Sequence, residues 1–305
     1  MEFRECIEQR NTILMEGALG ERLKREFGLQ LDEYVDMAKL IYDPKGAAAL
    51  SALWKEYLDI ASRYHFPFLA TTPTRRTNVE RIGKTDCPDT VIADNVAFLR
   101  KIQGTAETEM YVGGLMGCRG DAYTGVGALL EKDAFDFHRW SAERFQKAGV
   151  DFLYAGIMPT LPEAAGMARA MESTGLPYVI SFTIQADGCL IDGTPIADAI
   201  CYIDRVTQIS PVCYMTNCVH PSIVCRALMR PFNRKETVRN RFLGIQANTS
   251  PLPYAELDGA ADLKCSEPGE FAEEMCKLRS IHPIKIWGGC CGTDNRHMEC
   301  LAKRL

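Results

Sequence analysis

The chain has 305 residues, of which 47% are hydrophobic and 25% are charged, the balance of an ordinary soluble globular protein. Its net charge of −5 argues against nucleic acid as a partner, because neutralising phosphates requires a basic face. No run approaches the roughly 18 consecutive apolar residues of a membrane span. The charged start MEFRECIEQR also lacks the apolar segment of a secretory signal. We therefore expect a cytoplasmic protein that binds neither nucleic acid nor membrane.

Short apolar runs alternate with longer amphipathic stretches along the chain. The apolar runs predict eight strands, at residues 12–15, 66–72, 111–115, 151–156, 177–184, 211–217, 242–250 and 284–287. Helical spacing of apolar residues predicts helices at residues 45–65, 89–103, 134–149, 160–175, 194–209, 220–230, 267–281 and 293–305.

This alternation determines the fold class that we expect. Alternating β and α units imply parallel strands joined by right-handed crossovers. Eight such units in about 300 residues match the size of a (β/α)8 TIM barrel. A doubly wound open sheet is the alternative. No Pro- or Ser-rich linker interrupts the chain, so we expect a single domain over residues 1–305.

The thirteen cysteines are scattered and follow no pattern of a small disulfide scaffold. In a chain without an export signal we expect most of them to be reduced and to fill the core. Three differ in position, because Cys218 follows the sixth strand while Cys290 and Cys291 follow the eighth. Loops after barrel strands meet at the C-terminal face, so these three thiols are expected to converge there.

Three thiolates in one pocket suit zinc, which accepts sulfur ligands and prefers four in a tetrahedron. Gly288, Gly289 and Gly292 would let the backbone fold sharply enough for two adjacent cysteines to reach one ion. Two other interpretations remain open at this point. Glycines before a helix also cradle phosphate in barrels of this kind, and the cysteines could simply pack.

The motifs resemble those of the homocysteine S-methyltransferase family, which are zinc-dependent barrel enzymes. The specific part is TNC at residues 216–218 together with GGCCG at 288–292. Further matches are ILMEGALGERL at 13–23, the segment SFTIQADGCLIDGTPIADA at 181–199, and GIQANTSP at 244–251. The resemblance covers nearly the whole chain and favours zinc over the two other interpretations.

The resemblance implies a role for each matching residue. Cys218, Cys290 and Cys291 would bind zinc, and the thiol of the acceptor would take the fourth position. Zinc would lower the pKa of that thiol, and the resulting thiolate would attack a cationic methyl donor, a sulfonium or quaternary ammonium. The resemblance also implies substrate-binding residues: Glu16, which would meet the amino group of the substrate, Gly17, Thr71, Thr72, Asn217 and Asn248.

Three positions depart from the family pattern. Gly156 stands where a glutamate is expected, Pro73 where an asparagine is expected, and Arg75 where an aromatic residue is expected. The loss of a carboxylate at Gly156 and the gain of Arg75 and Arg76 nearby favour a less cationic, more acidic substrate. A zinc-binding homologue without catalysis, another thiol acceptor and a methyl-corrinoid donor therefore remain alternatives. The expected partners are a small thiol and a methyl donor, and a homo-oligomer is left open.

Overall fold

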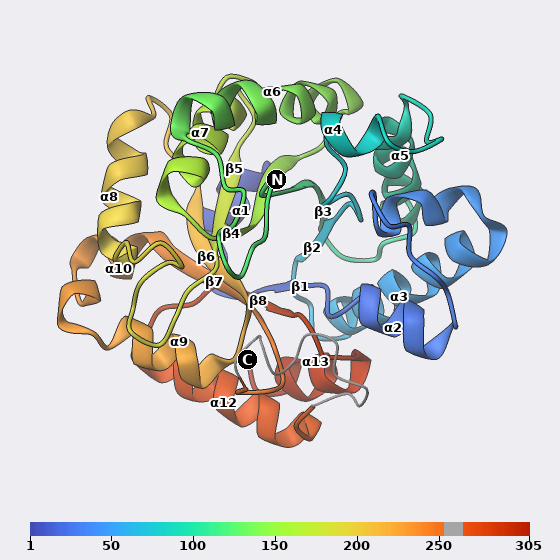
Figure 1. The fold of residues 1–305 in the computed structure, drawn as a ribbon. Coiled ribbons are helices and arrows are strands. Elements are labelled where there is room, and N and C mark those ends of the chain that lie inside the picture. Colours follow the sequence, from blue (N-terminus) through green and yellow to red (C-terminus); the bar gives the residue numbers. More distant parts are fainter. Residues whose placement is uncertain (253–264) are drawn as a thin grey trace.

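A closed barrel of eight parallel strands, in chain order, forms the centre of the molecule (Figure 1). The computed structural model describes residues 1–252 and 265–305. The strands are β1 Ile13–Met15, β2 Phe68–Thr71, β3 Met110–Gly117, β4 Phe152–Met158, β5 Tyr178–Phe182, β6 Cys213–Val219, β7 Phe242–Ala247 and β8 Ile286–Gly289. Each predicted strand is confirmed, and the pairing of β1 with β8 rules out the open sheet.

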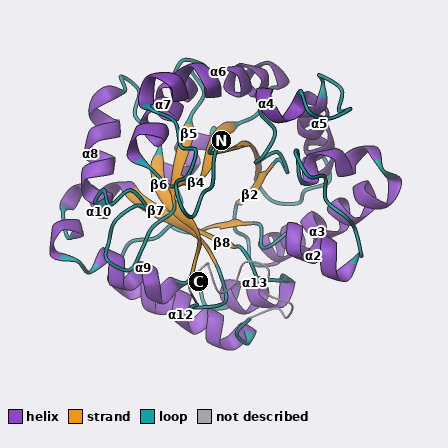
Figure 2. Ribbon diagram, viewed as in Figure 1, coloured by secondary structure: helices purple, strands orange, loops and turns teal. Residues whose placement is uncertain are grey.

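Helices surround the barrel, as the purple ribbons around the orange strands show (Figure 2). The predicted ones are α3 Pro44–Arg63, α5 Val91–Gln103, α6 Glu131–Ala148, α7 Leu161–Glu172, α8 Ile196–Val206, α9 Pro221–Leu228, α12 Pro268–Ile281 and α13 Asn295–Ala302. The others are short and follow no long periodic pattern: α1 Phe3–Gln9, α2 Gly20–Glu26, η1 Met37–Tyr42, α4 Val79–Ile82, η2 Pro231–Asn233 and α10 Glu236–Arg241. In the part of the chain that the structure describes, none of the helices has the length and apolarity needed to cross a membrane.

The short helix α1 closes the N-terminal end of the barrel. Phe3, Cys6 and Ile7 are buried and pack with side chains that point into the barrel. The ring of Phe3 stacks on that of Phe152, with centroids 4.1 Å apart, and meets Tyr111 edge-on at 5.7 Å. With this end filled, the C-terminal end of the strands is left for chemistry, as is usual for this fold.

Candidate metal centre

The three predicted cysteines lie together at the C-terminal end of the barrel. Their Sγ atoms are all within 4.8 Å of one another. With zinc–sulfur bonds of about 2.3 Å, sulfurs around a tetrahedral ion lie about 3.8 Å apart, so this group fits one zinc. The structure joins Cys218 to Cys290 as a disulfide, with their Cα atoms 5.5 Å apart. Both sulfurs become ligands only when that pair is reduced, because the ligand is the thiolate.

Unusual backbone geometry presents these cysteines. Cys218 has a φ of 58°, which is uncommon for any residue but glycine. It lies where the pairing of β6 with β7 shifts register, between Asn217 and Val219. Such a shift redirects a side chain at the rim of a barrel. Strained residues of this kind cluster at functional sites, and here the backbone turns the Cys218 side chain towards Cys290 after β8.

The turn after β8 depends on glycine at one position above all. Gly292 has a φ of 84°, and a Cβ built there would lie 2.1 Å from Oγ1 of Thr249. The turn is held to its neighbours because the Cys290 amide donates to the Ala247 carbonyl and the Thr249 amide donates to the Cys291 carbonyl. The two cysteines are therefore fixed against the end of β7.

The helix that follows, α13, is capped by Asp294 rather than by Thr293. Its carboxylate accepts from the amides of Arg296 and His297. Burial alone would raise the pKa of Asp294, but hydrogen bonds from His297 and Arg296 hold it well below its usual range. A carboxylate at this helix end opposes a bound phosphate, so the phosphate interpretation of the GGCCG turn loses its main support.

Cys291 faces the opening of the barrel, yet the protein around its sulfur removes water from it. This desolvation raises the pKa of the thiol, and Glu21 raises it further. The positive charge of Arg75 acts in the opposite direction. The Cys291 thiol therefore needs a cation to become a thiolate at neutral pH.

Glu16 lies at the end of β1 as a buried carboxyl group, and residues 1–252 and 265–305 give it no cationic partner. It accepts three hydrogen bonds from Thr71, from the amide at 3.1 and 3.2 Å and from the hydroxyl at 2.6 Å. Burial raises its pKa to about 8, although the bonds from Thr71 lower it in part. A buried carboxyl with a raised pKa and spare lone pairs is suited to receive an ammonium group.

Asn217, next to Cys218, is held by the two preceding strands. Its Oδ1 accepts from the amide of Ile157 at 3.0 Å and from the hydroxyl of Ser181 at 2.6 Å. Ile157 itself has a φ of 57°, in a bulge of β4. Asn217 thus fixes the orientation of the strand end that carries Cys218. The sequence had not pointed to Ile157 or Ser181 as supports.

The structure gives two other predicted residues roles within the protein. The Thr72 hydroxyl is fully buried between Thr74 Oγ1, at 2.7 Å, and the amide of Leu115, at 3.1 Å. Gly17 allows the ring of Tyr57 to pack closely, since a Cβ there would lie 2.7 Å from it. Packing therefore explains this glycine without a ligand.

Asn248 is better placed for a ligand. It is 5% exposed at the end of β7, and its Oδ1 has no hydrogen-bond partner among residues 1–252 and 265–305. His220, two residues after Cys218, caps α9 by accepting from the amide of Ser222 at 3.2 Å.

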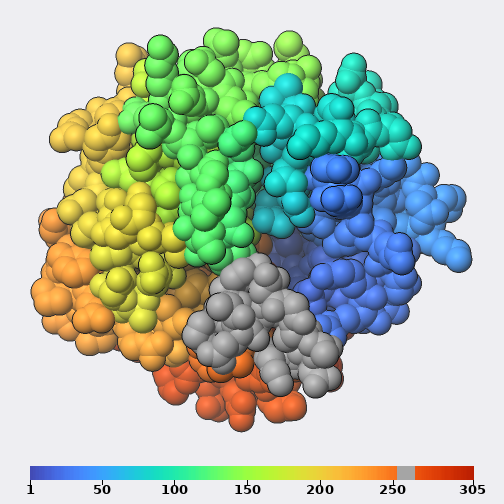
Figure 3. All heavy atoms as spheres, in the orientation of Figure 1, coloured from blue at the N-terminus to red at the C-terminus, as the bar shows by residue number. Residues whose placement is uncertain are grey.

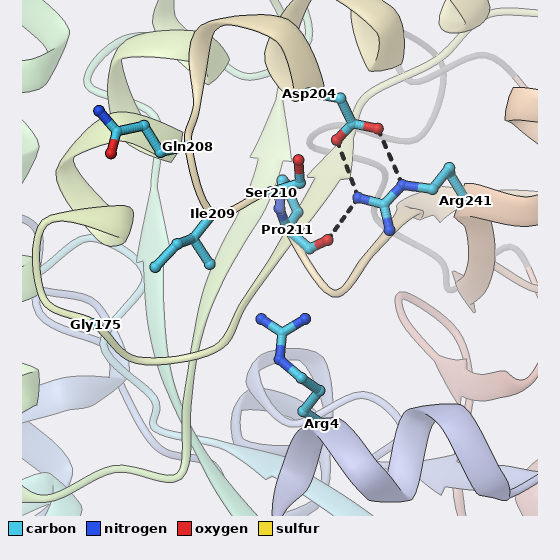
Figure 4. A pocket seen from close by; sticks show the side chains of 8 residues that line it. All are labelled: Arg4, Gly175, Asp204, Gln208, Ile209, Ser210, Pro211 and Arg241. Carbon is cyan, nitrogen blue, oxygen red and sulfur yellow. Dashed lines mark hydrogen bonds and ion pairs between the residues drawn. The ribbon is translucent and has the colours of Figure 1, made fainter.

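One cavity lies elsewhere and does not belong to this centre. It has a volume of about 690 Å³ and lies at the N-terminal ends of β6 and β7 (Figure 4). Arg241 on its wall already pairs with Asp204, at 3.0 Å, and with two carbonyl groups. Because that end of a TIM barrel serves stability, we assign no chemistry to it.

The profile of the family "Homocysteine S-methyltransferase" matches residues 13–305, nearly the whole chain. The chain belongs to the homocysteine S-methyltransferase family. The prediction of the family from TNC and GGCCG is thereby confirmed.

Individual relatives are more distant. The homocysteine S-methyltransferase YbgG of Bacillus subtilis (strain 168) is 33% identical over 92 residues, which are 30% of this chain and 29% of that protein. Among solved structures, the metallated form of the homocysteine methyltransferase MmuM from Escherichia coli has a TM-score of 0.77 at 19% identity, over 99% of both chains. Its oxidised form has a TM-score of 0.76 over 98% of both chains. At this identity the likeness establishes the shared fold.

Proposed function

We propose that this protein is a zinc-dependent S-methyltransferase that methylates a small thiol, with homocysteine as the acceptor. The observation that carries the proposal is the group of three sulfurs within 4.8 Å of one another at the functional end of the barrel. Three cysteines leave the fourth position of a tetrahedral ion open, which is the pattern of a catalytic rather than a structural site. Zinc bound there would lower the pKa of an incoming thiol, which makes it a nucleophile at neutral pH.

The surrounding residues divide the remaining tasks. Glu16 receives the amino group of the acceptor, and Thr71 holds the carboxyl group of Glu16 in place through 2.6–3.2 Å hydrogen bonds. Asn217 keeps the end of β6 aligned, and Asn248 offers its unpaired oxygen to the substrate. Sulfonium and ammonium donors lose their charge as the methyl group leaves, so a site with little water favours the reaction.

The test is methyl transfer to homocysteine by reduced, zinc-loaded protein with a panel of donors: sulfonium, quaternary ammonium and methyl-corrinoid. We expect methionine with at least one donor, and no methionine from Cys290→Ser. Cys201→Ser, which changes an exposed free cysteine on α8, is the matched control and should keep its activity.

Two outcomes would point to the alternatives. Methylation of other thiols but not of homocysteine would keep the chemistry and change the acceptor. Zinc-loaded protein that methylates no thiol with any donor would contradict the proposal. It would then favour a zinc-binding homologue without catalysis.

A further inference from the structure

Three arginines gather on the segment after β2, where the chain departs from its family. Arg75, Arg76 and Arg81 are all half-buried, and Arg81 lies in the short helix α4. Desolvation lowers the pKa of Arg81, and the nearby charges of Arg76 and Arg75 lower it further. Like charges this close and partly withdrawn from water destabilise one another unless an anion lies between them.

The described residues supply little negative charge to these arginines. Arg75 meets Asp36 at 3.5 Å, at the limit of a hydrogen bond, and Arg81 donates to the Tyr34 carbonyl at 3.4 Å. Arg76 makes no hydrogen bond or ion pair with any of the described residues. The nearest carboxylate on α4, Glu80, pairs with Arg119 at 3.0 Å. A half-buried arginine without a partner is uncommon, because its guanidinium group has five donors to satisfy.

The arginines belong to the same end of the barrel as the cysteines. The side chain of Arg75 lies over the end of β3, where a Cβ on Gly117 would be 2.8 Å from its Cγ. Its charge acts on Cys118 at the end of β3 and on Cys291 in the metal centre. In the space-filling view a hollow opens near the middle of this face, between the blue segment, the cyan segment that carries the arginines, and the green segment (Figure 3).

We propose that Arg75, Arg76 and Arg81 form a binding site for an anionic group, carboxylate or phosphate, on one of the two substrates. Assigning the anion to a substrate rests on the proposed function, but the existence of an anion site does not depend on methyl transfer. The planar fork of arginine fits the two oxygens of a carboxylate or phosphate, and such bonds are stronger than neutral ones. An anion there would supply Arg76 with the partner that the described residues do not give it, and would relieve the repulsion among the three charges.

The cluster also predicts selectivity between donors. A donor that carries only positive charge would be repelled by three arginines at the entrance. A donor with the same methyl centre and a carboxylate or phosphate would be attracted. Electrostatic recognition of this kind should weaken as salt is added, because exposed charges are screened within about 8–10 Å at physiological ionic strength.

The first experiment measures anion binding directly by calorimetry, with sulfate and glutarate as probes of the zinc-loaded protein. We expect the wild type to bind at least one probe, and Arg76→Gln and Arg75→Gln each to weaken that binding about tenfold. Arg139→Gln on α6 is the matched control, because Arg139 is 51% exposed and only weakly paired with Glu143. Equal binding by all four proteins, or no binding by any, would overturn the proposal.

Thermal unfolding separates a ligand site from a structural role. Arg76 has no partner among the described residues, so Arg76→Gln should unfold at the same or a higher temperature than the wild type in buffer without anions. A lower melting temperature for Arg76→Gln would mean that Arg76 stabilises the fold.

The second experiment identifies which substrate carries the anion. If it is the acceptor, Arg75→Gln should weaken homocysteine binding but not that of 3-aminopropanethiol, which lacks the carboxylate. If it is the donor, homocysteine binding should stay unchanged while the KM for an anionic donor rises. Anion binding is measured without turnover. A result that contradicts the anion site can therefore be distinguished from one that contradicts the methyltransferase proposal.

Discussion

At the scale of single residues, Glu16 is the side chain whose environment differs most from its ordinary one. Its pKa lies near 8 because it is buried at the end of β1 without a cation among the described residues, and hydrogen bonds from Thr71 lower the pKa only in part. An ammonium group bound beside Glu16 would favour the ionised form of its carboxyl group. The two groups would then form a buried, charge-assisted hydrogen bond. In the proposed function, substrate binding would therefore be coupled to the ionisation of Glu16.

Glu16→Gln should weaken homocysteine binding by about tenfold or more, because the amide cannot balance the ammonium charge. Calorimetry on zinc-loaded protein measures this, and 3-mercaptopropionate, a thiol without an amino group, provides the control. We expect its affinity to be the same for both proteins. Equal weakening of both ligands would mean that Glu16 acts on the site as a whole and not on the amino group.

The same carboxyl group should make stability depend on pH. Its pKa is about 8 in the folded protein against an ordinary value of 4.5, so the folded state holds a proton that the unfolded state releases between these values. This contribution to stability is complete below pH 4.5 and is lost as the pH rises through 8. The melting temperature of Glu16→Gln relative to the wild type should therefore rise from pH 5 to pH 9. A constant difference would contradict the raised pKa.

At the scale of elements, the turn from β8 to α13 would connect the proposed zinc site to the fold. Gly292→Ala would place a methyl group on Thr249 in a backbone conformation that L-residues rarely adopt. We expect a loss of stability of at least about 1–3 kcal/mol and weaker zinc binding, since the turn must move. Gly269→Ala, with nothing within 4 Å of the added Cβ, is the control and should leave zinc content unchanged. Denaturation and elemental analysis measure the two effects.

The strands could be predicted from the sequence because each is a short apolar run followed by a long amphipathic helix. The convergence of Cys218 with Cys290 and Cys291 followed from their positions after β6 and β8 in a closed barrel. The residues that hold the strand ends in place could not be predicted from the position of a residue after a strand. The hydrogen bond from the Ile157 amide to Asn217 depends on a bulge in β4, and no local sequence pattern predicts that bulge.

Short elements were missed for a related reason. The helix α1 has only seven residues, fewer than a periodic pattern needs, and it forms because Phe3, Cys6 and Ile7 enter the barrel. Arg81 was also missed, although Arg75 and Arg76 were noted. Arg81 lies near Arg75 and Arg76 because the chain forms the short helix α4 after them, and the spacing of the residues in the sequence does not predict this helix.

At the scale of the whole molecule, the two ends of the barrel have separate tasks. Phe3 packs against Phe152 and Tyr111 at the closed end, far along the strands from the cysteines. Phe3→Ala should cost about 3–5 kcal/mol of unfolding free energy, as other large-to-small core changes do. Zinc content and affinity for homocysteine should stay as in the wild type. Chemical denaturation tests the first expectation, and loss of zinc from folded Phe3→Ala would contradict the separation of the two ends.

The central claim is that three thiolates at the open end bind one zinc ion. Its most direct test is the zinc content of protein purified under reducing conditions, measured per chain for the wild type, Cys218→Ser, Cys290→Ser, Cys291→Ser and the control Cys201→Ser. We predict about one zinc in the wild type and control, and a large loss in each of the other three. Folded, reduced wild type that binds no added zinc would contradict the account.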